Sequence, residues 1–245
     1  DATKTQYVAE MKFIRALMYF NLVSEFGDVP LVTERLISTE QVAALTVRVK
    51  QELVYAQIIA DLKDVIASNL PVTQPASGKG RASLQAANGL LGQVYLRMGA
   101  TLGGPNAAAN FNNAKIYLLA CYNQKTFTTL SAIPFPDVFD VTKKTTCPEI
   151  IFQISYLQGD INYSSRLAAN NQAKGETINS QVVSTGAGGT LTEDLRKEFE
   201  TGDTRTNFSI KYASNVAVQS YFITKFRDVS ATAGTLGYGG NDFII

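Results

Sequence analysis

The most informative absence in this sequence is histidine, because none of the 245 residues is one. Catalysis by a Ser-His-Asp or Cys-His set, zinc binding through imidazole and pH switching by histidine are therefore excluded. Tryptophan is absent as well. A sugar or a base that stacks on this protein must use one of the 11 tyrosines or 13 phenylalanines.

Cysteine is scarce, since only Cys121 and Cys147 occur, and their spacing fits no metal site. A disulfide between them and two free thiols are both compatible with this count. A chain of this length can bury a core without a covalent cross-link, so we expect free, structural thiols.

The sequence also has no excess of positive or negative charge and no long apolar run. Lys and Arg total 22 against 21 for Asp and Glu, a formal net charge of +1, which gives no electrostatic case for binding nucleic acid or an anionic membrane surface. No apolar run approaches the roughly 18 residues of a membrane-spanning helix, and the start shows no signal segment. The hydrophobic content of 45% is that of an ordinary globular chain, and the length fits one domain or two small ones.

Apolar periodicity predicts a helical first half. A first helix over about residues 5–25 carries a row of apolar side chains at three- and four-residue steps: Tyr7, Met11, Ile14, Met18 and Leu22. Other apolar residues cover much of the remaining circumference, so this helix must be packed on more than one side. Tyr19, Phe20 and Phe26 are interpreted as core.

Three further helices are expected in this half, at about residues 47–68, from Ser83 onward and at about 106–122, with a connector at 31–46. Ser83 and Asn106 are the expected N-caps. The last two helices form an antiparallel hairpin, in which Gly89 and Gly92 allow close approach. Leu91-Gly92-x-x-Tyr95 is similar to part of the tetratricopeptide repeat pattern.

From Thr126 the composition changes, because repeated prolines preclude long helices. Residues 149–156 are predicted as a strand, 192–200 as a short helix, and 207–212 with 220–226 as a hairpin. Asp28, Arg81 and the pair Asp203–Arg205 are interpreted as local structural groups that satisfy backbone or charged partners. The acidic residues of 192–200 are interpreted as a solvated helix face, since nothing places two of them across a substrate.

Short blocks that occur in order along nearly the whole chain carry a family resemblance. They are Arg15-Ala16-Leu17-x-Tyr19-Phe20 running into Phe26-Gly27-Asp28-Val29-Pro30-Leu31, then Tyr55-x-x-Ile58-Ile59-x-Asp61-Leu62, Gly80-Arg81-Ala82, Leu91-x-x-Val94-Tyr95-Leu96, Asp137-Val138-Phe139, Glu149-Ile150-Ile151-Phe152, Phe199-x-x-Gly202-Asp203-x-Arg205, Lys225-Phe226-Arg227-Asp228 and Asn241-Asp242-Phe243. In this order they resemble the SusD/RagB family of surface lipoproteins, which bind nutrients for a partner transporter in Gram-negative bacteria.

The resemblance implies a mainly α fold of tetratricopeptide-like helical hairpins, with an irregular loop-rich region that contains a few short strands. We expect residues 1–125 to form the helical scaffold, and 126–245 to form a loop- and strand-rich, ligand-facing region of the same domain. Family members are longer at both ends, and the helical pattern begins almost at Asp1. The sequence is therefore expected to be part of a longer protein.

The function that the resemblance implies is that of a polysaccharide-utilisation protein. It would be a non-enzymatic, carbohydrate-binding subunit at the surface of the outer membrane that delivers a glycan or oligosaccharide to a SusC-like TonB-dependent transporter. No cofactor, metal or nucleic acid is expected, and contact with the membrane would be through a lipid anchor outside this sequence, since neither Cys121 nor Cys147 can carry it. The alternative is a helical-repeat scaffold that binds another protein without a small-molecule ligand.

The best candidates for ligand contact lie after the predicted strand, where two aromatic rings occur among hydrogen-bonding groups. Sugar recognition needs a ring for the apolar C–H face of the sugar, and Asn, Asp or Arg groups for its hydroxyls. The predicted binding residues are Tyr156, Asp160, Asn162, Tyr163 and Arg166. No catalytic or metal-ligating residues are predicted.

Overall fold

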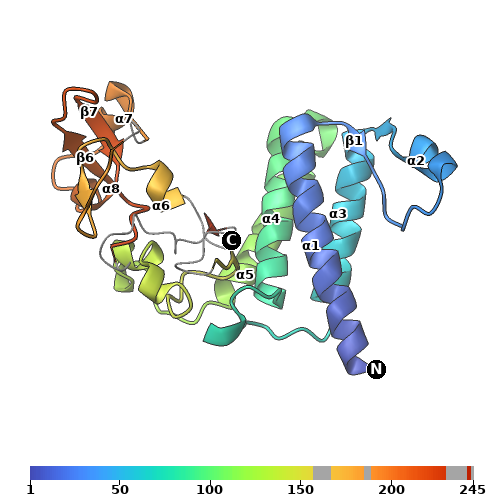
Figure 1. Cartoon of the computed structure of the whole chain (residues 1–245). Helices are drawn as coiled ribbons and strands as arrows, with labels where there is room; N and C mark the ends of the chain where they lie inside the picture. The colour runs from blue at the N-terminus through green and yellow to red at the C-terminus, as the bar shows by residue number, and fades with distance from the viewer. Residues whose placement is uncertain (157–166, 185–188, 230–241, 244–245) are drawn as a thin grey trace. The chain divides into compact units, whose positions relative to one another are not determined.

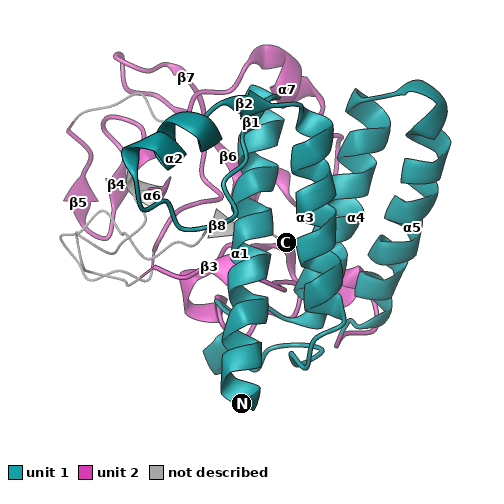
Figure 2. Cartoon of the chain, turned by 90° about the vertical axis from the view of Figure 1, so that its right-hand side faces the viewer, with its two compact units in different colours: residues 1–125, 245 teal, residues 126–244 magenta. Residues whose placement is uncertain are grey.

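The computed structural model describes residues 1–156, 167–184, 189–229 and 242–243. The described part is mainly helical with a few short strands, which confirms the predicted fold class. The chain divides into two compact units at residues 125 and 126 (Figure 2).

Unit 1 is a row of helices. Figure 2 shows α1, α3, α4 and α5 side by side in this order, and each packs on the next. The same four helices are labelled in Figure 1, where α1 lies in front. Its elements are α1 (Ala2–Phe26), β1 (Val29–Pro30), α2 (Thr39–Leu45), β2 (Arg48–Val49), α3 (Gln51–Ile66), the 3-10 turn η1 (Ala76–Gly78), α4 (Leu84–Thr101), the 3-10 turn η2 (Gly104–Asn106) and α5 (Ala107–Asn123). The two short strands pair antiparallel, Val29 opposite Val49.

Helix ends in unit 1 follow the expected capping chemistry. Ser83 caps α4, because its hydroxyl accepts a hydrogen bond from the Ala86 amide at 3.1 Å. Gly27 ends α1 with φ at +66°, a backbone region that side chains disfavour. Asn106 occupies the N-cap position of α5 as predicted, but its side chain makes no capping hydrogen bond, because the turn η2 leads directly into the helix. The connector also holds a helix that was not predicted, α2, with Ser38 as its N-cap.

The core of unit 1 lies between α1, α3 and α4. Apolar spacing in α3 predicts an inward stripe of Val54, Ile58, Leu62, Val65 and Ile66. The first four are fully buried, which confirms the stripe, and Ile66 is half-buried. In α4, Gly92 lies so close to α5 that an added Cβ would stand 2.6 Å from Leu118 Cγ. The expected close approach of the two hairpin helices is therefore present.

α1 buries a different face from the one on which the sequence analysis placed its apolar row. Ala9, Phe13, Ala16 and Leu17 are buried. The row Tyr7, Met11, Ile14, Met18 and Leu22 is 42–58% exposed. On a helix that is apolar around most of its circumference, periodicity does not distinguish the faces, and the face with two alanines permits the closer approach to α3. Phe26 was wrongly assigned to the core, because it is 62% exposed.

Unit 2 is built from short elements. They are the 3-10 turns η3 (Leu130–Ala132), η4 (Phe135–Val138) and η5 (Val141–Lys143), the strands β3 (Gln153–Ile154), β4 (Thr177–Ile178), β5 (Gln181–Val182), β6 (Ile210–Ala213), β7 (Ser220–Ile223) and β8 (Asp242–Phe243), and the helices α6 (Leu167–Asn170), α7 (Glu193–Lys197) and α8 (Thr206–Ser209). The strands form two-stranded antiparallel pairs, β3 with β8, β4 with β5 and β6 with β7. The strand predicted over 149–156 thus shrinks to two residues.

The two cysteines are buried free thiols, as expected. They lie in different units, Cys121 on α5 and Cys147 after η5. Within the described residues, no helix has both the length and the apolarity that crossing a membrane requires.

Candidate functional site

The hairpin of β6 and β7 places two tyrosines side by side in unit 2. Tyr212 and Tyr221 are directly opposite each other in the register, so their side chains project from the same face of the hairpin. Their ring centroids are 5.3 Å apart in an edge-to-face arrangement. The other face carries Phe222, which is 1% exposed and packs on Ala173 and Ala213. This alternation keeps one face in the core and leaves Tyr212 50% exposed.

Backbone hydrogen bonds along the edge of β7 bring α7 next to the tyrosines. The Leu191 amide donates to the Tyr221 carbonyl and the Ile223 amide donates to the Gly189 carbonyl, both at 2.9 Å. Thr192 then caps α7. As a result the Arg196 guanidinium carbon lies 5.4 Å from the Tyr221 ring centroid, within the range of a cation–π contact.

The turn after α7 is fixed by an ion pair. Gly202 has φ at +90°, and Asp203 accepts hydrogen bonds from the backbone amide of Arg205 at 2.9 Å and from its guanidinium at 2.6 Å. The side-chain hydrogen bonds of Arg205 lower the pKa of Asp203 to about 2, from an ordinary value of 3.8. The interpretation of these two residues as a local pair that holds the turn agrees with this geometry.

These elements enclose a cavity of about 670 Å³, which we call the tyrosine cleft. It is lined by Tyr212, Tyr221, Arg196, Thr206, Asn207 and Lys211, among others. The arrangement combines two aromatic rings with donors and acceptors from α7, α8 and β6. Both kinds of group are what recognition of a polyhydroxylated molecule requires, and the volume is in the ordinary range for a small-molecule site.

The sequence-predicted binding residues do not line this cleft. Tyr156 is half-buried after β3, and its carbonyl accepts a hydrogen bond from Lys144 Nζ at 2.7 Å. Burial lowers the pKa of Lys144. Asp160, Asn162, Tyr163 and Arg166 lie outside the described residues, so their role stays a prediction.

Sequence reasoning missed the tyrosine cleft although it predicted the hairpin. The signal was present, because Tyr212 and Tyr221 fall in the two predicted hairpin strands. Only the register shows that they face each other, and only the hydrogen bonds of residues 189–191 bring Arg196 to them. A search for tyrosines on opposed strands would have found the pair.

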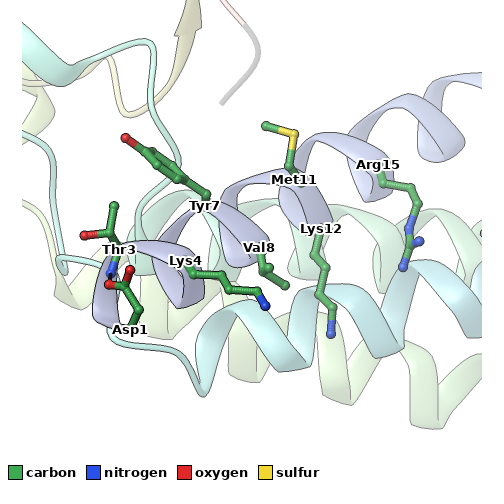
Figure 3. A pocket seen from close by; sticks show the side chains of 8 residues that line it. All are labelled: Asp1, Thr3, Lys4, Tyr7, Val8, Met11, Lys12 and Arg15. Carbon is green, nitrogen blue, oxygen red and sulfur yellow. Dashed lines mark hydrogen bonds between the residues drawn. The ribbon is translucent and has the colours of Figure 1, made fainter.

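A second cavity, of about 570 Å³, lies along α1 and is shown in Figure 3. Tyr7 and Met11 project from one side of the helix in this view, and Lys4 and Lys12 from the other. The ammonium of Lys12 is paired with Asp64, and the guanidinium of Arg15 with Asp61. Because its main cations are already paired and the rest is mostly apolar, this surface suits a hydrophobic contact better than a sugar.

The described residues contain no cluster of three or more Cys, Asp or Glu side chains that could hold a metal ion. In the tyrosine cleft the carboxylate of Asp203 is already paired with Arg205.

Comparison with known proteins gives one family match. Residues 1–96 match the model of a SusD-like family, whose description is "Starch-binding associating with outer membrane". A SusD-like protein of Formosa agariphila is 32% identical over 97 residues, which are 40% of this chain and 18% of that protein. A SusD-like protein of Bacteroides ovatus is 34% identical over 119 residues, which are 48% of this chain and 20% of that protein.

Solved structures share the fold of the whole chain. A SusD superfamily protein from Parabacteroides distasonis matches all of this chain with 24% identity and a TM-score of 0.78. A structure described as a laminarin binding SusD-like protein does so with 24% identity and a TM-score of 0.72. This chain spans 53% and 58% of those two chains, about half of their length.

Proposed function

Because the chain belongs to the SusD/RagB family, we propose that it binds a glycan or oligosaccharide and delivers it to a SusC-like TonB-dependent transporter of the outer membrane. Glycan binding is supported by the description of the matching family as starch-binding and by the laminarin-binding protein of the same fold. The transporter, the cell-surface location and a lipid anchor are proposed from the family alone.

The tyrosine cleft is the observation that supports a binding site in this part of the chain. The aromatic carbons of Tyr212 and Tyr221 present apolar surface to the C–H face of a sugar ring. Arg196, Asn207 and Thr206 stand around them and supply hydrogen bonds for the hydroxyls. A site of this kind holds its ligand by many weak contacts, which suits a protein that must release the ligand to a partner.

Binding without bond cleavage is part of the proposal. A glycosidase needs one carboxyl group that stays protonated near neutral pH and donates a proton to the leaving oxygen. The guanidinium of Arg205 does the opposite to Asp203, because it holds that carboxyl ionised down to about pH 2. Glu193 is engaged by Arg196 at 2.9 Å. Neither of these carboxylates fits the role of a general acid, and Glu200, the other carboxylate in the lining of the cleft, is exposed to solvent rather than held in an apolar pocket.

A second candidate function is that of a scaffold that binds another protein. The exposed apolar row of α1, from Tyr7 to Leu22, favours it, because contiguous apolar surface of this kind commonly marks a contact with a partner. The two functions use different units of the chain, so they are compatible with each other.

The test is isothermal titration calorimetry of the protein with malto- and laminari-oligosaccharides. Tyr212→Ala should weaken binding about tenfold or more, since an aromatic contact with a ligand ring is worth on the order of 1–3 kcal/mol. Tyr122→Ala is the matched control, because Tyr122 is 51% exposed on α5 in unit 1 and should leave affinity unchanged.

Equal losses of affinity in Tyr212→Ala and in the control Tyr122→Ala would contradict the tyrosine cleft as the binding site. If a broad panel of glycans showed no binding while a protein partner was captured with defined affinity, glycan binding itself would be wrong and the scaffold function would replace it.

A further inference from the structure

A second cavity adjoins the tyrosine cleft in unit 2. It has a volume of about 390 Å³ and shares Phe199, Asp203 and Ile210 with the cleft as lining residues. The shared residues place the two cavities next to each other around the turn that follows α7. We call the second cavity the leucine groove, because Leu191 and Leu195 line it together with Phe135 and Ile223.

The leucine groove offers a ligand mainly apolar surface, and its lining also includes the exposed carboxylate of Glu198 and the hydroxyl of Ser209. Leu195, on the short helix α7, is 52% exposed, so a large apolar side chain is open to solvent here. The one lysine of its lining, Lys225, already makes cation–π contacts. Its ammonium lies 4.9 Å from the ring centroid of Phe226 and 5.3 Å from that of Phe139.

The ion pair of Asp203 and Arg205 stands in the wall between the two cavities. Four hydrogen bonds of 2.6–3.1 Å join Asp203 to Arg205, so the pair is satisfied within the turn. It therefore calls for no opposite charge on a ligand that passes over it. The path from the tyrosines to Leu195 thus leads from a hydrogen-bonding site past a self-neutralised pair to an apolar one.

We propose that this double site takes an oligosaccharide that carries a small apolar substituent, of the acyl or aryl class. The inference rests on the proposed function and deepens it. A sugar ring lies against Tyr212 and Tyr221, and the substituent occupies the leucine groove.

An unsubstituted sugar leaves the leucine groove wet, because its hydroxyls would lose hydrogen bonds to water there and find few partners. An acyl or aryl group gains from the same surface by the hydrophobic effect. The groove is near the lower end of the volume range for small-molecule sites, which fits a compact group and not a long lipid chain.

The experiment compares free maltotriose and laminaritriose with their 4-nitrophenyl glycosides by calorimetry on the protein. The aryl form should bind about tenfold more tightly, a difference of about 1.4 kcal/mol. Leu195→Ser should reduce this ratio to near one. Leu119→Ser is the control, because Leu119 is a comparably exposed leucine on α5 and its replacement should keep the ratio.

Equal affinity for free and aryl-substituted sugars would overturn the inference and leave the proposed function standing. A tenfold preference that persisted in Leu195→Ser would also overturn it, since the aryl group would then bind elsewhere, for instance on the exposed face of α1. Failure of both forms to bind would count against glycan binding itself, and the inference would fall with it.

Discussion

At the scale of single residues, two charge pairs connect the helices of unit 1. Arg15 donates to both carboxylate oxygens of Asp61, at 2.8 and 2.6 Å, and Arg81 donates to both oxygens of Glu10, at 2.7 and 3.0 Å. These forked contacts join α1 to α3 and to the segment before α4. The interpretation of Arg81 as a structural group that reaches an acceptor elsewhere agrees with this contact.

The Arg15 pair should be the more costly to break, because the Asp61 side chain is 2% exposed. Arg15→Met leaves a buried carboxylate with only Gln57 as a hydrogen-bond donor, and we expect a loss of about 2–4 kcal/mol in the free energy of unfolding. Urea denaturation measures it. Lys12→Met is the control, because the Lys12–Asp64 pair is solvent-exposed and should contribute less than about 1 kcal/mol. Equal losses would contradict this account of the pair.

Gly92 is the glycine at which added volume should cost most. In Gly92→Ala the new methyl group meets Leu118 Cγ at 2.6 Å and the Leu118 amide nitrogen at 3.0 Å. We expect a loss of about 1–3 kcal/mol from overpacking, despite the gain in helix propensity. Gly99→Ala meets only the ring of Phe111, which is partly exposed and can turn away, so its cost should be smaller. Thermal unfolding of both variants gives the order, and a reversed order would contradict the close approach of α4 and α5.

The Asp203 carboxyl should titrate near pH 2 in the folded protein. Because its folded pKa lies below the ordinary value of 3.8, the stabilisation is present above about pH 4 and is lost as the pH falls toward 2. Arg205→Met removes the side-chain hydrogen bonds and should raise the pKa of Asp203 toward its ordinary value, although the backbone amide of residue 205 still donates to the carboxyl and keeps the pKa somewhat lowered. Carboxyl chemical shifts followed by NMR across this range provide the measurement, and a midpoint near 3.8 in the unaltered protein would be the contrary result.

At the scale of elements, α1 has one buried and one exposed apolar face. Substitutions at two adjacent residues, one on each face, distinguish the two faces by their effect on stability. Leu17 is buried and Met18 is partly exposed. Leu17→Ala should cost about 2–5 kcal/mol, whereas Met18→Ala should stay within about 0.5 kcal/mol. Chemical denaturation of the two variants compares them directly. A cost for Met18→Ala close to that of Leu17→Ala would show that the outer face is packed.

The sequence predicted elements well where a single local signal decided them. Ser83 marked the start of α4 because a serine side chain can satisfy a free helix amide, and α3 showed its stripe because only one of its faces is apolar. The same reasoning did not identify the buried face of α1, because the helix has two apolar faces and only tertiary packing decides which one is buried. The strand over 149–156 was overextended, because β propensity does not reveal how much of a strand finds a partner.

At the scale of the whole molecule, ordered sequence blocks predicted the resemblance to the SusD/RagB family, and solved structures of SusD-like proteins share the fold. The site depends on contacts that no block contains. Tyr212, Tyr221 and Arg196 come together through strand register and through an edge contact between residues 189–191 and β7. Such long-range pairings are set by the folded chain as a whole, so a local pattern could name the tyrosines but could not place the arginine beside them.

The proposed binding site of the ligand is the tyrosine cleft. Hydrogen–deuterium exchange of the protein with and without a bound oligosaccharide tests it most directly, because it reports on every segment at once. We predict slower exchange in residues 196–212 and at Tyr221, with unit 1 unchanged. Slower exchange confined to residues 156–166, or to α1, with the hairpin of β6 and β7 unaffected, would contradict the claim.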